Sequence, residues 1–157
     1  MTSAPLISVI PALSEVNLSV NTCFDADSVK AIADVIPKSK LQTLVIGKDC
    51  SVPIVASDVT ALGFSNQNFG PGELMLISSC VIPVSPALTA VNVMKNPIGE
   101  NGLAELMSAI GGTGVKTISG MTEGQTSLDW SNQNLTPMDV KILAADISFS
   151  SFSAAVT

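Results

Sequence analysis

The sequence predicts an α/β fold of strand-plus-helix units stacked as a solenoid. Three observations predict it: a segment that occurs twice, an apolar pattern that recurs along the chain, and helical periodicity in the second half of the longer units. The chain of 157 residues, 46% of them apolar, is long enough for one domain with a sizeable core.

The duplicated segment covers residues 60–81 and 126–147. Seven of its 22 positions are identical, including the whole of Ser-Asn-Gln-Asn. Most of the other positions hold chemically similar residues in the two copies, such as Phe64 and Trp130. Chance does not give this agreement, so the chain contains an internal repeat.

A short strand is expected at the start of each unit. Apolar residues at relative positions 1, 4 and 6 are followed by a polar residue at position 9. Four units begin at Leu13, Leu41, Val59 and Leu88, and two looser copies begin at Val115 and Gln125; the spacings are 28, 18, 29, 27 and 10 residues. Three spacings are therefore near 28, which is typical of one strand-plus-helix unit. The polar residues at position 9 are Asn21, Asp49, Gln67, Asn96, Glu123 and Gln133.

Helices are expected after four of these strands, because apolar residues three and four apart form one helix face. The faces are Val29, Ile32 and Ile36; Leu74, Ile77 and Val81; Leu103, Leu106 and Ile110; and Val140, Leu143 and Ile147. Gly70-Pro71 with Glu73, and Thr136-Pro137 with Asp139, mark two helix starts. Two ends are marked by Lys38 with Ser39 and by glycines 111, 112 and 114.

Two units lack a helix pattern. Residues 41–58 contain Pro53 and no helical period, so this unit is expected to return as extended chain. For residues 115–124 two alternatives remain open: extended backbone, or a hairpin between 115–119 and 126–130. Glycine at both ends of the link 120–124 favours a tight turn.

The best copies of the strand pattern read LSEVNLSVN at residues 13–21 and LTAVNVMKN at residues 88–96. With a helix in each full unit, this pattern resembles the leucine-rich repeat family, in its ribonuclease-inhibitor-like class. The resemblance implies a right-handed solenoid with parallel strands on the concave face and helices on the convex face, the position-9 side chains bonding the turns between coils. We divide the chain into an N-terminal cap (1–12), repeats (13–147) and a C-terminal tail or cap (148–157).

Composition excludes several function classes. The chain has no His, its seven cations are all Lys, and its net charge is −6, which argues against nucleic-acid binding and His-dependent catalysis. The glycines at 111–114 follow a helix where a phosphate-binding loop precedes one, and Asp25 with Asp27 lack the rest of a calcium loop. Asp139 and Asp146 are read as solvated helix positions. We therefore expect no enzyme, cofactor or metal.

Three features of the sequence bear on membrane insertion and on the cellular compartment. The uncharged run 74–94 contains Pro83, Pro86 and several polar residues, so we expect no transmembrane helix. No secretory signal or transit peptide is visible, and the chain is also compatible with a processed form. An odd number of cysteines without a close pair (Cys23, Cys50, Cys80) predicts free, buried thiols and an intracellular location, cytoplasmic or organellar.

The expected function is a non-catalytic protein-protein interaction scaffold, a subunit or accessory protein of a larger complex. Its uncharged ends and low charge fraction predict that partner protein covers an end or a flank. Strand positions 5 and 7 should face outward, which predicts contacts at Asn92, Met94 and Asp129, with Asn17 in the same row. Trp130 is expected in the core. The alternative is a regulator of a GTPase or other enzyme acting through its repeat face.

Overall fold

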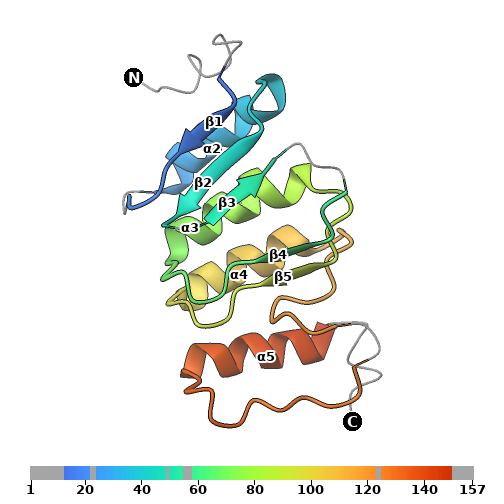
Figure 1. The fold of residues 1–157 in the computed structure, drawn as a ribbon. Helices are drawn as coiled ribbons and strands as arrows, with labels where there is room; N and C mark the ends of the chain where they lie inside the picture. Colours follow the sequence, from blue (N-terminus) through green and yellow to red (C-terminus); the bar gives the residue numbers. More distant parts are fainter. Residues whose placement is uncertain (1–12, 22–23, 49, 55–57, 123–124, 150–157) are drawn as a thin grey trace.

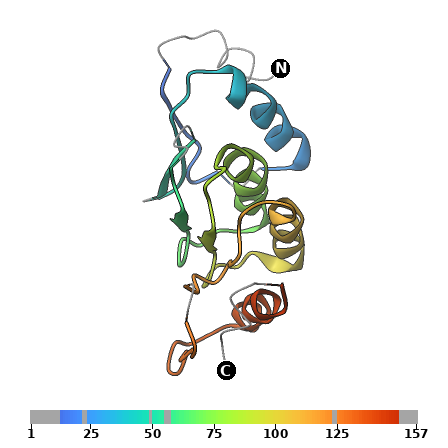
Figure 2. The same cartoon turned by 90° about the vertical axis from the view of Figure 1, so that its right-hand side faces the viewer.

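The computed structural model describes residues 13–21, 24–48, 50–54, 58–122 and 125–149 (Figure 1). Helices lie in one layer and the extended segments in another, as the side view in Figure 2 shows. The strands are β1 (Glu15–Asn17), β2 (Thr43–Gly47), β3 (Cys50–Pro53), β4 (Ala61–Gly63) and β5 (Ala90–Asn92). The helices are α2 (Ala26–Val35), α3 (Pro71–Leu76), α4 (Gly99–Ile110) and α5 (Pro137–Phe149). Short helical turns η1 (Ile36–Lys38), η2 (Ile77–Val81) and η3 (Ile82–Val84) extend α2 and α3.

The predicted right-handed leucine-rich repeat solenoid is wrong. The described residues form a mixed α/β structure with two separate small sheets, ordered β1-β2-β3 and β4-β5, in place of one continuous parallel sheet. The pairs β1–β2 and β4–β5 are parallel, whereas β3 is antiparallel to β2. The helix-free unit 41–58 turns back directly after β2, so β3 occupies the edge at which a further parallel strand would have paired. The prediction of extended chain is confirmed for residues 50–53, whereas residues 49 and 55–57 lie outside the described residues.

The unit 115–124 is also irregular. Residues 115–119 reach β5 only through the bridges Ala90–Thr117 and Asn92–Ser119. Within the described residues no ladder joins 115–119 to 126–130, and the latter segment runs outside both sheets. The hairpin alternative is therefore not seen there.

Three of the four predicted helix faces are confirmed, and the fourth is wrong. In α2, α3 with η2, and α4 the predicted apolar residues are buried or half-buried. In α5, however, Val140 and Ile147 are 54% and 49% exposed, while the buried side is formed by Asp139, Ile142 and Asp146. The helix is thus rotated by about one residue from the register that its apolar pattern predicts, because two carboxylates find hydrogen-bond donors on the buried side.

The repeated Ser-Asn-Gln-Asn motif forms a turn with left-handed backbone. Asn66 and Asn68 have φ of 58° and 60°, and Asn132 and Asn134 have φ of 57° and 52°. Asn tolerates this conformation better than other residues with a side chain do, which explains why the motif occurs at both turns. Val20 and Lys95 stand at the equivalent place in two other turns, with φ of 61° and 62°.

Asn96 ties two neighbouring turns together. Its Oδ1 accepts hydrogen bonds from the backbone N–H groups of Gln67 (2.9 Å) and Phe69 (3.0 Å). Its Nδ2 donates to the carbonyls of Phe64, Val93 and Met94. The predicted turn-bonding role is confirmed at Asn96. The Asn21 Nδ2 donates to the Leu18 and Ser19 carbonyls of its own turn, and Asp49 and Glu123 lie outside the described residues.

One cluster of buried apolar residues runs through both layers. Cys50 and Cys80 are free and buried, as predicted, and Cys23 lies outside the described residues. So do the predicted N-terminal cap and the tail beyond Phe149; residues 148 and 149 belong to α5. None of the helices in the described ranges is long and apolar enough to cross a membrane.

Candidate functional site

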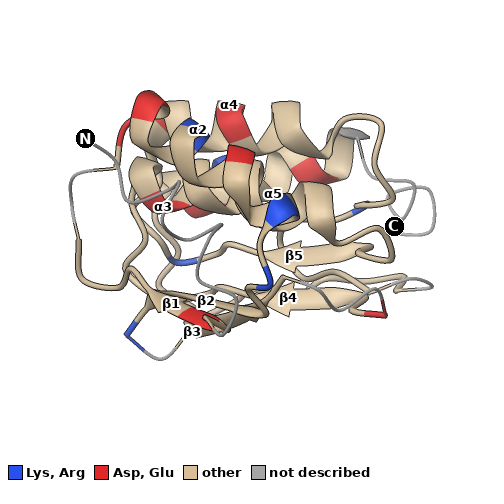
Figure 3. Cartoon of the chain, turned by 90° about the horizontal axis from the view of Figure 1, so that it is seen from above, with Lys and Arg blue, Asp and Glu red and all other residues tan. Residues whose placement is uncertain are grey.

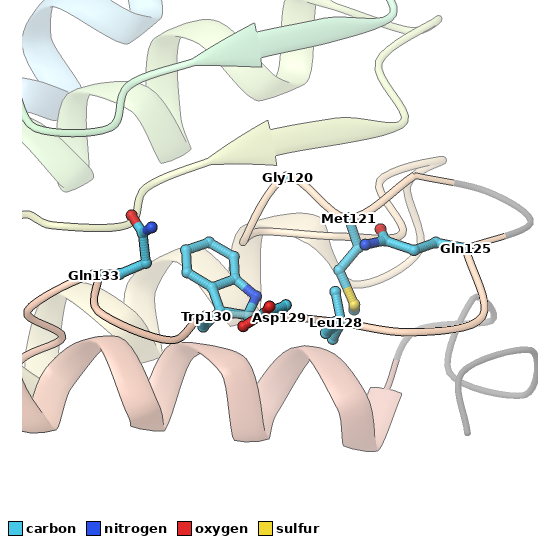
Figure 4. Close-up of a pocket in the computed structure, with 7 residues that line it drawn as sticks. All are labelled: Gly120, Met121, Gln125, Leu128, Asp129, Trp130 and Gln133. Atoms are coloured by element: carbon cyan, nitrogen blue, oxygen red, sulfur yellow. The ribbon is translucent and has the colours of Figure 1, made fainter.

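A hollow of about 210 Å³ lies between residues 120–121 and residues 125–133 (Figure 4). Segment 126–130 forms no strand ladder with 115–119 in the part of the chain that the structure describes. The hollow is lined by Gly120, Met121, Gln125, Leu128, Asp129, Trp130 and Gln133. Its wall therefore joins an indole, two aliphatic side chains, two amides and a carboxylate.

Asp129, a predicted contact residue, lies in this wall and is exposed. Hydrogen bonds from the Ser131 hydroxyl and the Ser131 backbone N–H hold the pKa of Asp129 below its ordinary value. The carboxylate is thus kept charged and is fixed in direction by the turn that follows it; the Ser131 N–H to Oδ1 distance is 2.9 Å.

Asn92, another predicted contact residue, lies beside the same hollow. A Cβ atom placed on Gly120 would lie 2.8 Å from Asn92 Nδ2, so the amide sits directly against this glycine. Gly120 has φ of 81°, a conformation that glycine adopts without steric cost. Asn92 therefore contacts Gly120, which lines the hollow together with Asp129.

The other two predicted contact residues are not part of it. Met94 is 1% exposed, so the expectation that it faces outward is wrong. Strand alternation ends at Asn92, and the left-handed turn at Lys95 directs the chain so that Met94 enters the core. Asn17 belongs to β1 in the other sheet, where its Oδ1 accepts from the Ser19 N–H at 2.9 Å.

A second cavity adjoins the hollow at Gln133, which lines both. This amide groove has a volume of about 580 Å³ and includes side chains from both copies of the repeated motif. It is lined by Asn66, Asn68, Lys95, Asn96, Pro97, Gln133, Asn134, Thr136, Pro137, Met138 and Asp139. Lys95 Nζ lies 3.4 Å from Gln133 Oε1. Figure 3 shows that the acidic residues lie mainly on the helices.

Two acids that hold the groove and α5 in place were judged wrongly from the sequence. Asp139 and Asp146 were expected to be solvated, but both are fully buried. Asp139 accepts from the Lys95 N–H (2.6 Å) and from the N–H and hydroxyl of Thr136. The spacing Thr-x-x-Asp at the helix start was a visible signal for the second of these contacts. Asp146 accepts from four donors on residues 117–119, and no sequence pattern indicates them.

Trp130, which was expected in the core, lies at the edge of the core. Its ring packs against the apolar core, yet it is only partly buried and lines the hollow. Within the described ranges, no group of three or more His, Cys, Asp or Glu side chains is placed to hold a metal ion.

Comparison with known proteins adds no relative. No family model matches this chain, and no curated protein matches it. The resemblance to the leucine-rich repeat family stays a prediction.

Proposed function

We propose that this protein is a non-catalytic protein-interaction module, a subunit or accessory protein of a larger complex, and that it binds an extended peptide segment of its partner. The observation that carries the proposal is the position of Gln133, which lines both the Trp130 hollow and the amide groove.

The size of the hollow favours a single side chain as its occupant. At about 210 Å³ it is smaller than the roughly 300–1,000 Å³ of sites that enclose small molecules. Trp130, Met121 and Leu128 offer an apolar wall, and tryptophan is among the residues that contribute most to protein-protein binding energy. Asp129 at the rim adds an acceptor for a basic or N–H-bearing neighbour.

The chemistry of the groove suits a peptide backbone. Each Asn or Gln side chain both donates and accepts hydrogen bonds, as a peptide group does. Three exposed side chains stand on left-handed turns: Asn66, Asn68 and Asn134. Hydrogen bonds to the side chains of Asn96 and Asp139 hold these turns in place. Groups that are ordered before binding lose little conformational entropy when a peptide docks.

The test is selection from a random peptide library displayed on phage, with the immobilised protein as bait. Selected peptides are expected to share one apolar side chain, and Asp129→Lys or Gln133→Ala should weaken their binding by about tenfold or more. Asn17→Lys is the matched control, since Asn17 is an exposed amide in the other sheet, and it should leave affinity unchanged. Peptides that bind all three variants equally well would refute the assignment of the site.

A further inference from the structure

The Trp130 hollow and the amide groove carry opposite charges. Asp129, which lines the hollow, is exposed, and Lys95, which lines the groove, is half-buried. Asp139, the acid of the groove, is fully buried, and its oxygens accept hydrogen bonds from Lys95 and Thr136. The two cavities therefore offer a ligand one negative charge in the hollow and one positive charge in the groove.

The negative charge has a fixed position. Asp129 Oδ1 accepts from the Ser131 N–H at 2.9 Å, so the carboxylate is held by its own turn. In the view of Figure 4 the Trp130 ring lies between the side chains of Asp129 and Gln133. A peptide that places one side chain against the indole therefore passes the carboxylate on one side and Gln133 on the other.

The positive charge is held at Gln133. The Lys95 N–H donates to Asp139 Oδ1 at 2.6 Å, which fixes the backbone from which the side chain starts. Lys95 Nζ lies 3.4 Å from Gln133 Oε1. The ammonium thus stands beside the residue that the two cavities share.

Both charges are available to a ligand. The ion pairs found among the described residues are Lys30–Asp34 and Lys141–Glu100, and they use neither Asp129 nor Lys95. Charges on an interface attract an opposite charge and repel a like one, so they select the partner and fix its orientation more than they add affinity. The order of charges along the site therefore determines the order of charges in its ligand.

We propose that the partner segment is a peptide of mixed charge, with a basic side chain against Asp129, an acidic side chain against Lys95 and its apolar side chain between them. This inference rests on the proposed function, since it specifies which peptide the same site takes. Residues 129 and 133 are four positions apart, so their Cα atoms are separated by at most about 14 Å. An extended peptide covers that distance in about four residues, and its two charged side chains are expected about three to six residues apart.

The test is a charge exchange between the protein and a peptide selected from the phage library. Two synthetic versions of that peptide are made, one with its basic residue changed to Glu and one with its acidic residue changed to Lys. Each change should weaken binding to the unaltered protein by about tenfold or more, measured by the fluorescence of the single tryptophan. Asp129→Lys should restore the affinity for the first version, and Lys95→Glu should restore it for the second.

The controls separate a local charge from the net charge. Glu105→Lys and Lys40→Glu make the same charge changes at exposed positions, on α4 and next to β2, and they should restore neither peptide. Asp129→Asn keeps an oxygen for the Ser131 N–H and removes the charge. It should weaken binding of the selected peptide about threefold and reduce the loss of affinity between about 0.05 and 0.5 M NaCl. Circular dichroism establishes that each variant is folded.

Two results would overturn the inference and leave the proposed function standing. The first is a set of selected peptides that depend on Gln133 and bind equally well after either charge is reversed. The second is restoration by Glu105→Lys that is as strong as restoration by Asp129→Lys. A library that yields no peptide whose binding depends on Gln133 would instead refute the proposed function, and this inference with it.

Discussion

Removing the Asp146 carboxylate should destabilise the protein more than any surface substitution. Asp146 Oδ1 accepts from the Ile118 N–H at 2.9 Å, and Oδ2 accepts from the Ser119 N–H at 3.1 Å. Oδ2 also accepts from the hydroxyls of Thr117, at 2.6 Å, and Ser119. All of these residues are at most 1% exposed, so water does not replace the lost acceptor.

The magnitude follows from the donors that are left behind. In Asp146→Ala the Ser119 N–H keeps the Thr117 Oγ1 as an acceptor, at 3.3 Å, but the Ile118 N–H loses the acceptor that Asp146 Oδ1 provides. An unsatisfied buried donor costs about 1–3 kcal/mol, so the free energy of unfolding should fall by at least about 1–3 kcal/mol. Asp146→Asn should cost about half as much, since its carbonyl oxygen keeps the Ile118 N–H while its NH₂ group faces the Ser119 N–H.

Urea unfolding followed by circular dichroism measures these differences. The control is Asp34→Ala, which removes an exposed acid that pairs with Lys30 and should cost no more than about 0.5 kcal/mol. If Asp146→Ala costs no more than Asp34→Ala, the reasoning that α5 is anchored by its buried acids is wrong.

Three further predictions concern stability and reactivity. Val20→Asn should raise the free energy of unfolding by about 1 kcal/mol, because Val20 has φ of 61° and Asn tolerates this conformation; unchanged urea midpoints would contradict it. Ser78→Ala should also stabilise by about 1 kcal/mol in the same assay, since the buried Ser78 Oγ has no hydrogen-bond partner in the described part of the chain; a loss of stability would show that the hydroxyl is bonded. Burial raises the pKa of the Cys80 thiol to about 12, so at pH 8 only about one in 10⁴ molecules carries the thiolate. Mass spectrometry after alkylation should find Cys80 unmodified in the native protein and modified in urea, and native labelling at the rate of a small-molecule thiol would refute its burial.

Most helices and the repeated turn could be predicted from the sequence. The prediction failed where the hydrogen-bond partners of a side chain come from segments far away in the chain. Leu74, Ile77 and Val81 lie on a buried face because their spacing matches a helix that is packed on both sides. The same spacing misled in α5, where Asp139 and Asp146 meet backbone and hydroxyl donors from segments far away in sequence.

The pairing of the strands was predicted wrongly for a related reason. A pattern of apolar residues predicts that a strand has a buried side, but it does not say which edge it pairs with. Residues 50–53 therefore read as the return of a parallel coil, although they turn back onto β2.

At the candidate site, strand alternation failed for Met94, which lies beyond the end of β5 and is buried. Asp129 lines the hollow although segment 126–130 is not a strand, so alternation does not account for its position. The junction of hollow and groove at Gln133 depends on the three-dimensional packing of both Ser-Asn-Gln-Asn turns.

The most direct test of peptide binding is the indole N–H resonance of Trp130, the only tryptophan in the chain. In a ¹⁵N–¹H spectrum this single signal reports on the hollow, and the side-chain NH₂ signals of Gln133 and Asn134 report on the groove. Titration with a library-selected peptide should shift all three signals to saturation with one common affinity. A peptide that binds and leaves the Trp130 and Gln133 signals unmoved would show that the interaction surface lies elsewhere.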